Sequence, residues 1–174
     1  MSTPSAKLLV WAGEHCACIR IIGRANFTTS IDFKTLITEL RQQGRDYFLL
    51  DLAECVLMDS TFLGVLAGFG LKLSGGNGNQ GLHGIELFNP SPRILELLDT
   101  LGVLHLFTVT QGAVNLPEPA EPQAHTPASS TKEEVTRTCI EAHRTLMDIS
   151  PANVARFKDV AQFLAEGLKK PKSE

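Results

Sequence analysis

The stretch that decides the fold is YFLLDLAECVLMDSTFLGVLAGFGLKLS, residues 47–74. Residues 47–52 form a continuous apolar run between polar neighbours, which is typical of a strand that is covered on both faces. Met58, Asp59 and Ser60 then form a turn, and an apolar helix follows from Ser60, because an Asp-Ser pair is a helix-start signal. The sequence therefore predicts that the Ser60 hydroxyl lies at a strand-to-helix junction, near the protein surface.

Length and composition indicate a globular protein with one core of ordinary domain size and an appendage: 174 residues, 43% hydrophobic and 20% charged. A formal net charge of -3 argues against a nucleic-acid partner, which requires a basic surface. No signal peptide is evident and no apolar run is long enough to insert into a membrane, so we expect a cytoplasmic protein. The four cysteines do not have the spacing of a disulfide framework, which favours reduced thiols.

Strands alternate with single amphipathic helices up to about residue 111. Strands are predicted over residues 7–11, 16–22, 84–88 and 104–109, and further helices start at Ser30 and at Ser91-Pro92. The predicted order is β-β-α-β-α-β-α-β, an α/β fold with a mixed, mostly parallel sheet flanked by helices and its first strand antiparallel at one edge. The glycine-rich residues 75–81 leave a helix and enter a strand, so we interpret them as a turn and not as a phosphate loop.

A proline-rich segment divides the chain into three parts: residues 1–111, a linker over residues 112–130, and a helical hairpin over residues 131–170. The first hairpin helix is predicted from a capping box of Ser130 and Glu133, and the second from Ser150-Pro151. We expect these helices to dock onto the first domain or onto a second copy, as a homodimer, because each apolar seam is narrow. The seam residues predicted to pack are Val135, Cys139, Leu146, Phe157 and Leu164.

No combination of residues resembles a catalytic site, and we expect neither enzymatic activity nor a cofactor or metal. Asp32, Asp51 and Asp59 near one edge of the sheet leave magnesium binding as a minor alternative. Cys139 and His143 lie four residues apart on a predicted helix, but two ligands do not make a metal site. We interpret them as a seam cysteine beside a solvated histidine.

Ser60 has two interpretations, a helix cap or a regulatory switch. A phosphoryl group at this position would face the positive end of a helix and would add about two negative charges to the surface. The helix that follows has a second apolar face, formed by Phe62, Val65, Phe69 and Leu73. A partner, a second subunit or the C-terminal hairpin must cover that face, unless the helix is buried deep in the core. Gly64 and Gly68 would let another element approach the helix backbone closely.

Several motifs resemble the signature of the STAS domain, the family of anti-sigma factor antagonists. They are Leu50-Asp51-Leu52, Met58-Asp59-Ser60-Thr61, Leu63-Gly64-Val65-Leu66 and Asn89-Pro90-Ser91-Pro92. The resemblance covers residues 7 to about 111 and implies a STAS fold. It also implies partner switching: in that family a serine kinase, which is also the anti-sigma factor, phosphorylates the first hydroxyl residue after the aspartate. Carried over, Ser60 is the phosphoacceptor, and the partner-binding residues are Asn26, Asp59, Ser60, Thr61, Phe62, Val65 and Phe69.

Two positions depart from the family pattern. Phe62 stands where the family usually has glycine, and Asn26 stands where many members have an aspartate that faces the kinase. The alternative interpretation is therefore a constitutive STAS scaffold or accessory subunit, in a stress-signalling assembly or beside a membrane transporter, which requires no phosphorylation. A phosphoryl-transfer enzyme is a third and more distant alternative.

Overall fold

The computed structural model describes residues 6–74, 84–113, 123–124 and 130–169. The strands are β1 (Lys7–Ala12), β2 (Cys16–Ala25), β3 (Tyr47–Asp51), β4 (Cys55–Met58), β5 (Gly84–Phe88), β6 (Thr108–Thr110) and β7 (Gln123–Ala124). The helices are α1 (Phe27–Gln42), α2 (Ser60–Ser74), α3 (Pro92–Thr100), the short 3₁₀ helix η1 (Leu104–Leu106), α4 (Lys132–Ile149) and α5 (Ala152–Lys169).

The sheet confirms the predicted mixed α/β architecture. Its strand order is β6-β5-β3-β2-β1-β7, with parallel pairing from β2 through β6 and antiparallel pairing of β1 with β2. The two residues of β7 pair with β1, so β1 is not the edge strand that the sequence predicted. The strand predicted over residues 104–109 is also wrong: η1 occupies its first half, and β6 begins only at Thr108.

Strand β2 changes partner along its length. Residues Cys16 to Arg20 pair with β3, whereas Gly23 to Ala25 pair with β4, a strand that the sequence did not predict. The register shifts between Gly23 and Arg24, and Gly23 has a φ of 102°, a conformation that glycine adopts without strain. Gly23 therefore bends β2 instead of ending it, which corrects the predicted boundary.

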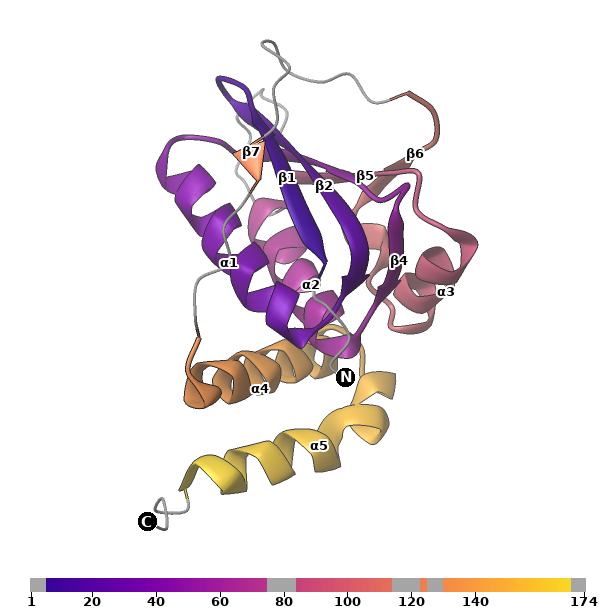
Figure 1. Ribbon diagram of the computed structural model, residues 1–174. Helices are drawn as coiled ribbons and strands as arrows, with labels where there is room; N and C mark the ends of the chain where they lie inside the picture. Colours follow the sequence, from indigo (N-terminus) through magenta and orange to yellow (C-terminus); the bar gives the residue numbers. More distant parts are fainter. Residues whose placement is uncertain (1–5, 75–83, 114–122, 125–129, 170–174) are drawn as a thin grey trace.

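Helices α1 and α2 pack against one face of the sheet (Figure 1). Alternate residues of β2, such as Ile19 and Ile21, point into this core, and Phe33 of α1 meets Phe62 of α2 with ring centroids 5.0 Å apart. The second apolar face of α2 is thus covered mainly by α1. Of the alternatives drawn from the sequence, burial in the core is the one observed.

Helix caps set the starts of α1 and α3. Asn26 caps α1, and its side chain accepts hydrogen bonds from the Thr28 and Thr29 amides. Because this capping box lies upstream of Ser30, α1 starts earlier than predicted. Ser91 caps α3 with a proline in its first turn, as the sequence predicted.

The C-terminal helices α4 and α5 form a hairpin-like pair that docks onto the first part of the chain (Figure 1). Leu146 of α4 is fully buried in the main hydrophobic core, and Phe157 of α5 packs against the same core. The observed capping box of α4 joins Thr131 and Glu134, one residue later than predicted. The predicted turn at 75–81 and most of the predicted linker at 112–130 lie outside the described residues.

Candidate functional site

Two helices begin side by side at one corner of the sheet. The last residues of β2 and β4, Ala25 and Met58, are direct partners in a parallel ladder, and each strand leads immediately into a helix. The Asp59 N–H donates to the Ala25 carbonyl at 3.0 Å, which fixes the two exits together. The starts of α1 and α2 therefore share one surface, which contains Asn26, Asp59 and Ser60.

Asp59 caps α2. Its Oδ1 accepts the Phe62 amide at 2.9 Å, and its carboxylate also accepts the amides of Thr61 and of Phe27 at the start of α1. Ser60 is consequently the first helical residue and not the cap, which corrects one interpretation of the sequence. Burial raises the pKa of Asp59, while these amide hydrogen bonds and nearby His143 act in the opposite direction.

The Ser60 hydroxyl is bound by a residue from the far end of the chain. Ser60 Oγ lies 2.8 Å from Nε2 of His143, and Nδ1 of His143 lies 2.6 Å from the Cys139 carbonyl oxygen. A carbonyl can only accept, so Nδ1 carries the proton of the neutral ring and the Ser60 hydroxyl donates to Nε2. His143 is buried, whereas the sequence predicted a solvated side chain. Nothing in the spacing of residues 60 and 143 indicated this contact.

The next residue, Thr61, also contacts α4. Its hydroxyl donates to Cys139 Sγ at 3.5 Å, so Cys139 does pack in the seam as predicted. Both nitrogens of His143 are already hydrogen-bonded, and the pair does not form a metal site. Among the described residues, no group of three histidine, cysteine or acidic side chains could hold a metal ion. Asp51 forms an ion pair with Arg20 at 2.9 Å and does not join Asp59.

The three apolar residues predicted to bind a partner are arranged differently from that expectation. Phe62 is completely buried against Phe33, and Phe69 is 5% exposed against the same ring. Neither side chain presents a surface to a partner in this conformation, because α1 covers both. Val65 is half-buried beside α4.

The open part of the site lies on the α1 side of Asp59. A hollow of ≈ 430 Å³ is lined by Arg24, Ala25, Asn26, Phe27, Thr28, Leu57 and Asp59, and we call it the corner surface. The Phe27 side chain is 47% exposed there, although it is a large apolar residue. The sequence had a signal for it, an aromatic residue directly after the helix cap Asn26, but the late predicted start of α1 concealed it.

No family model matches this sequence, and no curated protein matches it. Among solved structures, the chain is similar to the anti-sigma factor antagonist SpoIIAA in its unphosphorylated form, with a TM-score of 0.51 and 17% identity over 60% of this chain and 87% of that one. The phosphorylated form of SpoIIAA, a Bacillus cell fate determinant, aligns with a TM-score of 0.48 and 17% identity over 60% of this chain and 90% of that one. The chain thus has the STAS-like fold of SpoIIAA, as its motifs predicted. No described helix is long and apolar enough to cross a membrane.

Proposed function

We propose that this protein is a non-enzymatic regulator that binds a serine kinase with anti-sigma activity at the corner surface and the adjoining start of α2. One observation carries the proposal: β2 and β4 place Asn26, Asp59 and Ser60 together on a SpoIIAA-like fold. These are the residues at which the motif resemblance places partner binding. Their convergence supports that role for them, and Thr61 adjoins the same surface.

The corner surface has the chemistry of a protein contact. It joins an exposed aromatic side chain, Phe27, to a solvent-exposed cation, Arg24, and to the partly buried carboxylate of Asp59. Aromatic and arginine residues contribute a large share of binding energy at protein interfaces. Burying the exposed part of Phe27 gives a partner a favourable apolar contact, and Arg24 favours an acidic group beside it.

Phosphorylation of Ser60 would change this surface electrostatically. The Asp59 carboxylate already occupies the amides at the start of α2. A phosphoryl group on Ser60 would therefore add about two negative charges beside an existing carboxylate and would remove the hydroxyl that His143 now binds. Both effects would alter the contact with a partner, so Ser60 is suited to a switch.

The test is affinity capture with the full chain and two matched variants. Phe27→Ser removes the exposed aromatic ring of the corner surface, and Phe163→Ser removes a ring that is 75% exposed on α5. We expect the parent and Phe163→Ser to capture a serine kinase and Phe27→Ser to capture about tenfold less. Equal capture by all three proteins, or capture without any kinase, would contradict the proposal. Intact mass of the captured protein, compared with Ser60→Ala, tests whether Ser60 is phosphorylated.

The second candidate is a constitutive scaffold or accessory subunit. It is favoured by the hydrogen bond between Ser60 and His143, which places the hydroxyl against α4 and away from an incoming kinase. In that case Ser60→Asp changes binding only by disturbing α4, and cells contain no phosphorylated form. A stable complex with a transporter subunit, retained by Ser60→Ala, would establish this alternative.

A further inference from the structure

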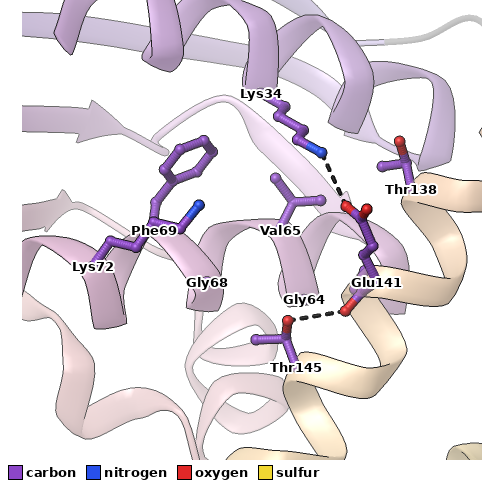
Figure 2. A pocket seen from close by; sticks show the side chains of 10 residues that line it. Lys34, Gly64, Val65, Gly68, Phe69, Lys72, Thr138, Glu141 and Thr145 are labelled. Carbon is purple, nitrogen blue, oxygen red and sulfur yellow. Dashed lines mark hydrogen bonds and ion pairs between the residues drawn. The ribbon is translucent and has the colours of Figure 1, made fainter. Parts of the chain in front are cut away.

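Helix α4 lies along α2 directly beyond Ser60. Figure 2 shows the crevice between them, with Gly64, Val65 and Gly68 on α2 facing Thr138, Glu141 and Thr145 on α4. Lys34 of α1 reaches across to Glu141, and their charged atoms are 3.0 Å apart. The helix from the far end of the chain thus covers the part of α2 that adjoins the proposed partner surface.

The two helix backbones touch at Gly64. A Cβ atom built on Gly64 would lie 2.3 Å from the Ala142 carbonyl oxygen and 2.7 Å from the Ala142 Cβ, which are distances that real Cβ atoms do not reach. At Gly68, one turn later, the same atom would be 3.8 Å from Thr145 Cγ2, an ordinary contact. Glycine at position 64 is therefore required for α4 to lie where it does, and glycine at position 68 is not.

The other contacts at this end of α4 are polar. They are the hydrogen bonds from Ser60 to His143 and from Thr61 to Cys139, together with the ion pair of Lys34 and Glu141. The ion pair is largely exposed to solvent, and such pairs contribute little to stability. The apolar anchors, Leu146 and Phe157, lie further towards the hairpin turn. The first two-thirds of α4 is thus held by contacts that water can replace.

We propose that α4 is an autoinhibitory helix: it covers Ser60 and the adjoining side of α2, and a partner gains this surface only when α4 moves away. The inference rests on the proposed function and names the regulation of the same site. Its physical basis is that the contacts are intramolecular and individually weak. A protein partner that offers Ser60 and Lys34 equivalent contacts would replace them at little net cost.

Local opening of α4 is tested by hydrogen exchange measured on the full chain, with no partner present. We expect α4 amides before Ala142 to exchange at least about tenfold faster, relative to their intrinsic rates, than amides of β3. Gly64→Ala, which forces α4 outward, should accelerate them by a further tenfold or so, and the matched variant Gly68→Ala should not. Exchange of α4 at the rate of β3 in the parent would overturn the proposal, because α4 would then be a permanent part of the core.

A reversible lock tests whether opening matters for binding. In Thr61→Cys, the new thiol lies close to Cys139, since the Thr61 Oγ1 and Cys139 Sγ atoms are now 3.5 Å apart, and oxidation is expected to join them. We expect the reduced variant to capture the kinase and the oxidised one to lose most of that capture. Equal capture in both redox states overturns autoinhibition and leaves the proposed function intact. Capture by neither form and not by the parent refutes the proposed function, while hydrogen exchange still decides whether α4 opens.

Discussion

Replacing Asn153 by aspartate should loosen the C-terminal helices selectively. The Asn153 side chain is fully buried, and its Nδ2 donates to the carbonyl oxygens of Leu101 and Leu146, each at 2.8 Å. One amide group thereby ties the start of α5 to the ends of α3 and α4. An aspartate has nearly the same shape, but at neutral pH it has no hydrogen to donate and would place a negative charge against two carbonyl oxygens.

The expected loss follows from those two contacts. Each hydrogen bond contributes about 1 kcal/mol net, and leaving buried groups without partners adds about 1–3 kcal/mol. The free energy of unfolding of the hairpin should therefore fall by about 3–5 kcal/mol, which corresponds to roughly 6–20 °C in Tm for a chain of this size. Acidification should reduce the loss, because a protonated aspartate can donate one hydrogen bond.

Urea unfolding followed by two signals measures this effect. Far-ultraviolet circular dichroism reports the helices, and fluorescence of Trp11, the single tryptophan, reports the sheet at β1. We expect the circular dichroism transition of Asn153→Asp to shift to lower urea by more than the fluorescence transition. Gln162→Glu makes the same chemical change at an exposed position of α5 and should leave both curves within about 0.5 kcal/mol of the parent. An Asn153→Asp protein as stable as Gln162→Glu would refute this account of the hairpin.

Three further outcomes follow from burial. Burial raises the pKa of Asp59, so the folded state binds its proton more readily; this group stabilises the fold at pH values below its ordinary pKa of 3.8, and that contribution is lost as the pH rises through the raised value. Asp59→Asn keeps a cap and should abolish this part of the pH dependence in urea unfolding, whereas Asp59→Ala should cost about 1 kcal/mol or more at neutral pH. Phe62→Ala should cost about 3–5 kcal/mol because it empties a core site, whereas Phe163→Ala should change stability by less than about 0.5 kcal/mol; similar losses in urea unfolding would contradict the burial of Phe62. Burial raises the pKa of the Cys18 thiol to about 12 and of the Cys55 thiol to about 11, so neither should react with a disulfide reagent near neutral pH until the protein is unfolded; rapid labelling of the native protein would contradict this.

Most of the fold could be predicted from local pattern. The buried strand β3, the start of α2 at Ser60 and the strand β5 follow from apolar runs and helix-start residues, and the structure confirms them. Strand β4 was missed because it is only four residues long and has one exposed and one half-buried position, so no clear periodicity distinguishes it from a turn. Its pairing with β2 depends on the bend at Gly23, which is a tertiary feature.

The candidate site was predictable only in part, for a related reason. The motif around Asp59 and Ser60 identified the corner of the sheet, but it could not show that α1 covers Phe62 or that His143 binds the Ser60 hydroxyl. Contacts between residues 83 positions apart depend on how the hairpin docks. The close approach expected at Gly64 was correct, and the occupant, Ala142, is known only from the structure. Phosphorylation and the identity of the partner stay predictions.

The most direct test of the central claim, that α4 covers the start of α2, is the protonation pattern of the His143 ring in the full chain. Nitrogen-15 NMR at about pH 8, above the ordinary pKa of an imidazole, distinguishes the two neutral tautomers. If α4 lies on α2 as described, the proton is on Nδ1, which donates to the Cys139 carbonyl, and Nε2 is a bare acceptor for Ser60. The exposed His15 provides the reference for an unconstrained ring. A His143 spectrum averaged between tautomers like that of His15, or with the proton on Nε2, would contradict the account.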